Sequence, residues 1–147
     1  MASSIQVTDI SHVIQLAVAP VFLLAGIGGM LSVLSIRLGR IIDRARQLDG
    51  LLAASDKQDR AAINREHRTL RRRARLASVA ITLCTLCALL ICTVIVVLFV
   101  GAYLSLNLVN LVAGLFVIAM LTLITALLTF LREIYLGTSN LRIGGNE

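Results

Sequence analysis

The sequence predicts an all-α membrane protein with three transmembrane helices and an antiparallel helical hairpin between spans one and two. Three observations predict this fold class. The 147-residue chain is 58% hydrophobic, well above the level of a soluble domain. Residues 13–36 and 76–131 contain no charged side chain and no histidine. Residues 37–75 carry twelve of the fourteen basic residues and five acidic residues, which gives this segment a formal charge of +7.

The two uncharged segments predict three spans. A transmembrane helix needs about 20 mostly apolar residues, and residues 13–36 supply one such stretch. As a single helix, residues 76–131 would be roughly 84 Å long, nearly three times the ~30 Å hydrocarbon core. This segment must therefore turn once, with spans at about 76–103 and 108–131 and an outer turn between them. The whole chain, residues 1–147, is expected to form a single membrane domain.

The charged segment 37–75 predicts the topology. Lysine and arginine accumulate in short cytoplasmic loops, so we expect this segment in the cytoplasm and the N-terminus outside. The start of the chain lacks the basic region of a signal peptide and carries Asp9 instead. We therefore expect the first span to be retained as a membrane anchor.

The first helix is expected to start near Ile10, with Thr8 or Asp9 as its N-cap. It contains Pro20, which favours a kink. It also carries small residues at a spacing of four, which lets helix backbones approach closely. We expect these residues to pack against a helix of the same chain or of another chain; they are Ala25, Gly28, Gly29, Ser32, Ser35 and Gly39.

Apolar residues at heptad spacing predict that the charged segment forms two helical arms with a coiled-coil seam. The first arm carries Leu38, Ile41, Ala45, Leu48 and Leu52, and the second carries Ile63, His67, Leu70, Ala74 and Ala77. Residues 55–58 (SDKQ) match a capping box, so a new helix is expected to begin there.

Four arginines lie directly against the second span: Arg71, Arg72, Arg73 and Arg75. Such a cluster attracts the head groups of anionic lipids, or it only fixes the topology of the chain. We expect anionic membrane lipids as partners. Nucleic acid is not expected as a partner, because no aromatic residues are interleaved with the basic ones.

Two further polar sets lie in or near the spans. His12, Gln15, Asn107 and Asn110 are expected to form an outer polar cluster. Thr122, Thr125 and Thr129 form a stripe on one face of the third span, which either lines a pore or supports helix packing.

Catalytic and metal sites are not expected. Cys84 and Cys87 have the spacing of half a zinc or redox site, but Cys92 lies off their shared face and both histidines lie elsewhere in the chain. We interpret these cysteines as small apolar fillers. The predicted spans contain no acidic or basic residue, which argues against a pump or a proton-coupled transporter. No cofactor is expected.

Residues 14–24 (IQLAVAPVFLL), 37–46 (RLGRIIDRAR) and 72–76 (RRARL) together carry a family resemblance. The chain resembles a family of small bacterial three-span membrane proteins catalogued as a domain of unknown function. The resemblance extends from about residue 10 to residue 136. It implies a multi-pass protein of the bacterial inner (cytoplasmic) membrane and brings no activity or catalytic residue.

Two hypotheses for the function follow. The first is a membrane structural or interaction protein without catalytic activity, which self-associates or serves as an accessory subunit of a larger membrane complex. The alternative is a homo-oligomeric channel for ions or small solutes.

Overall fold

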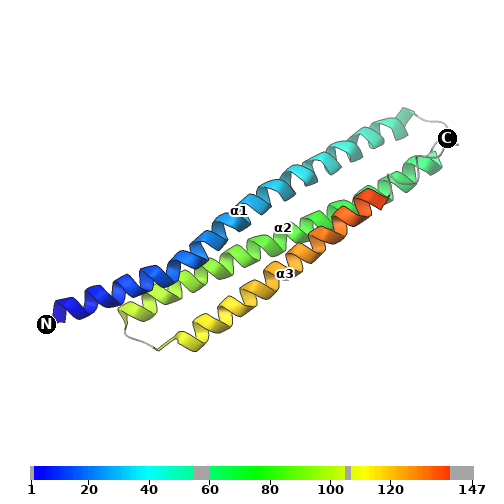
Figure 1. Cartoon of the computed structure of the whole chain (residues 1–147). Coiled ribbons are helices and arrows are strands. Elements are labelled where there is room, and N and C mark those ends of the chain that lie inside the picture. The colour runs from blue at the N-terminus through cyan, green and yellow to red at the C-terminus, as the bar shows by residue number, and fades with distance from the viewer. Residues whose placement is uncertain (1, 55–59, 105–106, 140–147) are drawn as a thin grey trace. The chain divides into compact units, whose positions relative to one another are not determined.

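The computed structural model describes residues 2–54, 60–104 and 107–139, and this part of the chain contains three α-helices (Figure 1). They are α1 (Ala2–Ala54), α2 (Arg60–Tyr103) and α3 (Val109–Ser139). The predicted all-α class is confirmed. Each helix contains a stretch that is long and apolar enough to cross a membrane, as predicted: Ile14–Leu51, Ile63–Tyr103 and Val109–Tyr135.

Two boundaries differ from the predictions. The first helix begins at Ala2 and not near Ile10, so neither Thr8 nor Asp9 is its N-cap. Residues 2–9 contain no glycine or proline, so nothing in them stops a helix from forming. The third helix continues to Ser139, eight residues beyond the predicted end of the span. The expected capping box at residues 55–58 lies outside the described residues.

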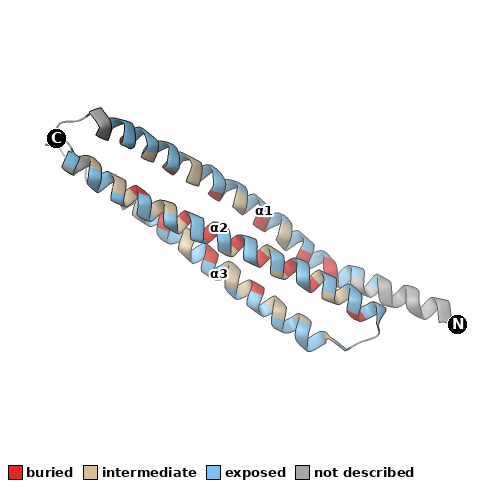
Figure 2. Ribbon diagram, turned by 180° about the vertical axis from the view of Figure 1, so that it is seen from behind, coloured by how far each residue is buried: buried red, intermediate tan, exposed pale blue. Residues whose placement is uncertain are grey.

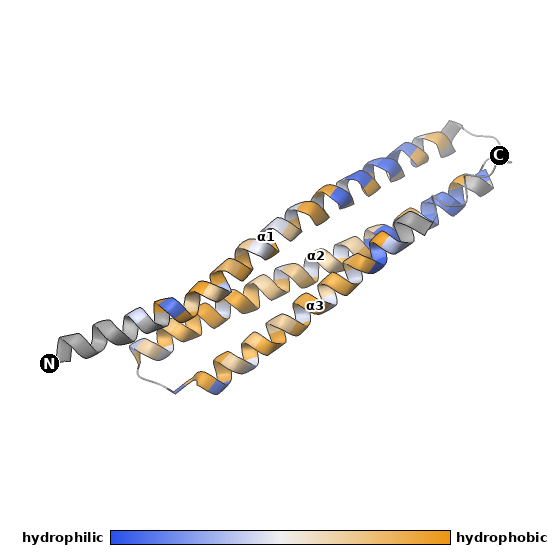
Figure 3. Ribbon diagram, in the orientation of Figure 1, coloured by the Kyte–Doolittle hydropathy of each residue, from blue (hydrophilic) through white to orange (hydrophobic). Residues whose placement is uncertain are grey.

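The hydropathy pattern follows the sequence along each helix (Figure 3). Most of α3 and the last half of α2 are apolar, whereas the end of α1 and the beginning of α2 are hydrophilic. Helix α1 is continuous through Pro20 and through the change from apolar to charged residues at Arg37. The charged segment therefore extends the first two apolar helices without a break in either helix.

Buried residues recur every seven positions along the helices (Figure 2). This is the spacing of side chains that face a neighbouring helix in supercoiled bundles. In α1 the buried positions at this spacing are Pro20, Ile27, Leu34, Ile41 and Leu48. Helix α2 has two such rows, one with Leu70, Ala77, Cys84 and Ile91, and one with Ala80, Cys87, Val94 and Gly101. In α3 the row is Ala119, Ala126 and Glu133.

The chain divides into two compact units, and each helix contributes to both. The first unit combines Met1–Leu31 with Leu83–Ile124. Within it, the Cys84 thiol lies 3.9 Å from the sulfur of Met30 in α1, and the Cys87 thiol donates a 3.2 Å hydrogen bond to the Ala119 carbonyl in α3. Helix α2 therefore contacts both other helices in this unit.

The second unit combines Ser32–Thr82 with Thr125–Glu147 and holds the charged residues of α1 and α2. Its apolar core is a cluster of Ile41, Leu48 and Leu70, against which Ile63 and Ala74 pack. All five belong to the two heptad seams read from the sequence. Burial of these side chains removes apolar surface from solvent and so contributes to holding the two arms together.

Candidate functional site

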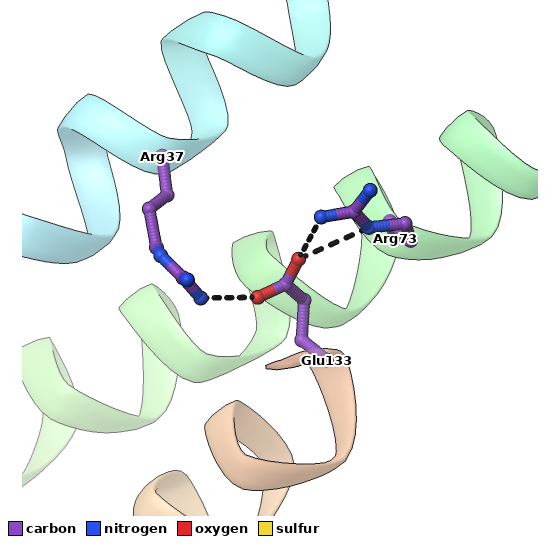
Figure 4. A network of polar contacts seen from close by, with 3 residues as sticks. All are labelled: Arg37, Arg73 and Glu133. Carbon is purple, nitrogen blue, oxygen red and sulfur yellow. Dashed lines mark hydrogen bonds and ion pairs between the residues drawn. The ribbon is translucent and has the colours of Figure 1, made fainter. Parts of the chain in front are cut away.

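A buried carboxylate joins the three helices within the second unit (Figure 4). The side chain of Glu133 in α3 is 2% exposed and lies between Arg37 of α1 and Arg73 of α2. Arg37 donates from Nη1 to Oε2 of Glu133 at 2.9 Å. Arg73 donates from Nε at 3.2 Å and from Nη2 at 3.0 Å, both to Oε1. We call these three residues the arginine–glutamate bridge.

The heptad pattern of α3 explains why Glu133 is buried. Ala119 and Ala126 precede it at intervals of seven residues and are fully buried. Glu133 is the next position on the same row, so its side chain points toward the other helices. Its carboxylate meets Arg37, the first charged residue after the uncharged part of α1.

The bridge compensates for the burial of a charged group. Burying an ionised carboxylate is costly unless it is paired and hydrogen-bonded. Both oxygens of Glu133 accept hydrogen bonds from charged donors, and no buried side-chain nitrogen or oxygen in the described residues is left without a partner. Arg37 also lies over the ring of Phe130 in α3, with 5.3 Å between the guanidinium carbon and the ring centroid. The ion pair and the cation–π contact of Arg37 therefore both join α1 to α3.

Two weaker polar contacts join α1 and α2 further from the apolar segments. Arg44 donates from Nε and Nη2 to Oε1 of Glu66, at 3.0 and 2.9 Å. Nδ1 of His67 lies 3.4 Å from a carboxylate oxygen of Asp49. Both contacts pair a late residue of α1 with an early residue of α2, as antiparallel helices require. The Arg44–Glu66 pair is exposed and so contributes little stability.

The predicted arginine cluster does not act as one unit. Arg71, Arg72 and Arg75 are exposed, so they remain available to an anionic surface. Arg73 is half-buried and bound to Glu133. Its guanidinium therefore positions α3, a role that the sequence pattern alone did not indicate.

The small residues of α1 lie outside its buried row. Ala25, Gly28, Gly29, Ser32 and Ser35 are exposed, and Gly39 is half-buried. A Cβ atom built on Gly28, Gly29 or Gly39 would meet nothing within 4 Å. These positions therefore do not pack against another helix within the described part of this chain.

The threonine stripe is satisfied within its own helix. Thr122 donates a 2.8 Å hydrogen bond to the Ile118 carbonyl, and Thr129 donates one of 2.8 Å to the Thr125 carbonyl. Thr125 is exposed, and the other two threonines are half-buried. Both hydroxyls use their hydrogen within α3, and their oxygens keep acceptor capacity, so the pore and packing interpretations both stay predictions.

The expected outer polar cluster stays a prediction. Gln15, Asn107 and Asn110 are all exposed, and no hydrogen bond between Gln15 and either asparagine occurs in the described structure. The side chain of His12 lies outside the described residues. Cys84 and Cys87 are buried and Cys92 is exposed. Among the residues that the structure describes, no group of three or more histidine, cysteine or acidic side chains is placed to hold a metal ion.

Glu133 is the site residue that sequence reasoning missed. The predicted third span ends at residue 131, and the sequence analysis assigns no role to Glu133, two residues further on. The sequence feature that indicates its burial is the seven-residue spacing from Ala119 through Ala126 to Glu133. This spacing continues the packed face of α3 beyond the uncharged segment. A single acidic residue on such a row, near a segment rich in arginine, predicts an ion pair between helices.

Comparison with known proteins identifies the family. A family model described as "Protein of unknown function (DUF2721)" matches residues 17–143. The chain belongs to this family. The match covers most of the first candidate membrane helix and all of the other two of this DUF2721 protein, and it includes Arg37, Arg73 and Glu133. No curated protein and no solved structure matches the chain.

Proposed function

We propose that this DUF2721 protein is a membrane structural or interaction protein without catalytic activity. It self-associates or serves as an accessory subunit of a larger membrane complex. We further propose that it lies in the bacterial inner membrane with its N-terminus outside and with residues 37–75 as a cytoplasmic hairpin. The charge of +7 on residues 37–75 supports this orientation, because basic residues accumulate on the cytoplasmic side.

The observation that carries this proposal is the unpartnered small-residue face of α1. Small residues allow helices to approach closely in a membrane, where van der Waals packing and not the hydrophobic effect drives association. In this chain Gly28 and Gly29 are exposed and have no neighbour within 4 Å of a built Cβ. A helix of a second copy or of another membrane protein can occupy this face without any change in the contacts of the chain itself.

The arginine–glutamate bridge supports a role as a scaffold. It ties α3 to both arms of the charged segment through three hydrogen bonds to one carboxylate. A fixed arrangement of these helices presents the exposed side chains of the hairpin in a constant geometry. The hairpin is therefore our proposed docking element for a cytoplasmic partner.

The channel alternative has weaker support. A pore needs polar groups that face a continuous aqueous path. Thr122 and Thr129 donate to carbonyls of their own helix and are half-buried within the chain, so only Thr125 of the stripe is exposed. We therefore favour the packing role for this stripe.

Native mass spectrometry of the full-length protein in detergent or nanodiscs tests the proposal without cross-linking. We expect a defined homo-oligomer, or a complex with a different membrane protein. Gly28→Leu should reduce that assembly, because the new side chain fills the space that a neighbouring helix needs. Gly114→Leu is the matched control, since Gly114 is also exposed, helical and without a neighbour within 4 Å.

Three outcomes have distinct meanings. Loss of assembly only in Gly28→Leu supports association through α1. A stable monomer of the unmodified protein, without any co-purified membrane protein, contradicts the proposal. A ring of four or more copies supports self-association and makes a conductance measurement in planar bilayers the next experiment.

A further inference from the structure

An open hollow in the second unit is lined mainly by arginines. Its volume is about 270 Å³, and its charged lining consists of Arg37, Arg40, Arg44, Arg73 and Glu133. Four guanidinium groups and one carboxylate give this lining a formal charge of +3. We call it the arginine hollow. Such a concentration of positive charge repels itself unless an anion shares the space.

The existing contacts leave many donors of the hollow unused. A guanidinium group has five N–H donors. Arg73 uses its Nε and Nη2 for Glu133, and Arg44 uses the same two nitrogens for Glu66, so Nη1 of each is left over. Arg40 is exposed and has no hydrogen-bond or ion-pair partner among the described residues.

Glu133 prepares this hollow for an anion. It holds Arg37 and Arg73 in fixed positions at one side of the lining. Its two oxygens accept three hydrogen bonds from these two arginines, and the two positive charges offset its negative charge. Preorganised donors bind more tightly than mobile ones, because less side-chain freedom is lost on binding.

We propose that the arginine hollow binds a phosphate group. A phosphate presents several oxygens in different directions, and the planar fork of arginine binds phosphate oxygens in pairs. Arg40 of α1 offers its whole guanidinium fork, and Arg44 of α1 and Arg73 of α2 each offer the remaining Nη1 group. The exposed cluster of Arg71, Arg72 and Arg75 does not line the hollow and supplies only diffuse attraction to an anionic surface.

The position of the hollow along the chain favours the head group of an anionic phospholipid as the source of the phosphate. The uncharged part of α1 ends at residue 36, and Arg37 and Arg40 follow within about 6 Å along the helix axis. The polar head-group region extends about 5 to 7 Å beyond each side of the hydrocarbon core. This argument about the source rests on the proposed membrane placement, whereas recognition of the phosphate group rests only on the hollow.

Native mass spectrometry of delipidated, full-length protein titrated with phosphatidylglycerol tests this proposal. Arg40→Gln removes a hollow arginine that has no other partner, and Arg72→Gln removes an exposed arginine outside the hollow. We expect Arg40→Gln to weaken binding of the first lipid about tenfold, the effect of losing a hydrogen bond to a charged group. We expect Arg72→Gln to change it by less than about threefold, as for an isolated surface charge.

A parallel titration with inorganic phosphate separates the two sources. If millimolar phosphate fails to displace phosphatidylglycerol and binding depends on Arg40, the source is the lipid. If inorganic phosphate binds more tightly than the lipid with the same dependence on Arg40, the site takes a soluble phosphate compound. Equal effects of Arg40→Gln and Arg72→Gln, or no effect of either, overturn the proposal.

The phosphate-binding experiment and the assembly experiment test different parts of the protein. Arg40→Gln leaves the glycine face of α1 unchanged, so the oligomer mass should be unaltered. Gly28→Leu leaves the hollow unchanged, so phosphatidylglycerol binding should persist. Circular dichroism and the midpoint of thermal unfolding check that each variant keeps its helices, which separates a lost site from a lost fold.

Discussion

Glu133 and Arg37 are separated by 96 residues, yet Nη1 of Arg37 donates a 2.9 Å hydrogen bond to Oε2 of Glu133. The same carboxylate accepts two hydrogen bonds from Arg73. One acidic side chain of α3 thereby contacts the beginning of the first arm and the end of the second arm of the charged segment. The stability of the second unit should depend on this contact more than on any other polar contact described above.

Glu133→Gln should lower the free energy of unfolding by about 2 kcal/mol. Removing one partner of a buried ion pair costs more when the remaining charge stays buried. Arg37 and Arg73 are partly exposed, so water compensates for some of the loss. Thermal or denaturant unfolding in detergent measures the change. Glu66→Gln is the control, because its pair with Arg44 is exposed and should contribute within about 1 kcal/mol. Equal effects of the two variants would contradict a special role for Glu133.

Arg73→Lys should destabilise the protein by about 1 kcal/mol even though the charge is kept. Arg73 donates from two nitrogens to one carboxylate oxygen, and lysine cannot reproduce that geometry. The neighbouring variant Arg72→Lys changes an exposed side chain and should lie within about 0.5 kcal/mol of the unmodified protein. Comparison of the two unfolding midpoints checks this prediction. A result in which Arg73→Lys matches Arg72→Lys would show that only the charge of Arg73 matters.

Leu48→Ala should destabilise the charged helical pair by about 3 kcal/mol. Leu48 is 2% exposed and belongs to the cluster with Ile41 and Leu70, so its truncation leaves a cavity. Leu51→Ala on the same helix removes the same atoms from a side chain that is 52% exposed, and its effect should be below about 1 kcal/mol. Hydrogen exchange of the α1 amides near these residues measures the difference. Similar protection in both variants would contradict the packing described for this cluster.

Thr122→Val combined with Thr129→Val should leave assembly intact and change stability by less than about 1 kcal/mol. Each hydroxyl bonds to a carbonyl of its own helix, and the carbonyl keeps its helical hydrogen bond after the substitution. Native mass and the unfolding midpoint measure these outcomes. Conductance of the unmodified protein that is abolished in the double variant would instead favour the channel alternative.

The proposed topology predicts which engineered cysteines react in intact cells stripped of their outer membrane. In a Cys92→Ser background, Asn107→Cys should react with a membrane-impermeant maleimide from outside. Arg46→Cys should react only after the inner membrane is permeabilised. Both positions are exposed, so accessibility of the side chain does not limit either reaction. The opposite labelling pattern would place the charged segment outside the membrane.

The fold class was predictable because composition and charge act over long stretches. The uncharged segments predicted the three long helices. The concentration of arginines in residues 37–75 predicted where the charged arms extend from them. The seam residues Ile41, Leu48 and Leu70 were predictable from heptad spacing and are buried together.

The bridge was not predicted because its residues are far apart in the chain. Glu133 lies two residues past the uncharged segment, and Arg73 lies within a run of three consecutive arginines. Composition alone cannot distinguish Arg73 from Arg72, which is exposed. Only the rotation of each helix relative to its neighbours separates the residue that faces inward from those that face outward.

The seven-residue rows of buried side chains limit how the lengths of these helices can change in evolution. One residue inserted into α1 after Leu34 would rotate every later side chain by about 100° and move Ile41 and Leu48 away from Leu70. Seven residues inserted into α1, with seven at the matching level of α2, would restore the register and lengthen both arms by about 10 Å. Relatives with longer or shorter arms should therefore differ by paired insertions or deletions of whole heptads, and Arg37, Arg73 and Glu133 should stay in register with one another.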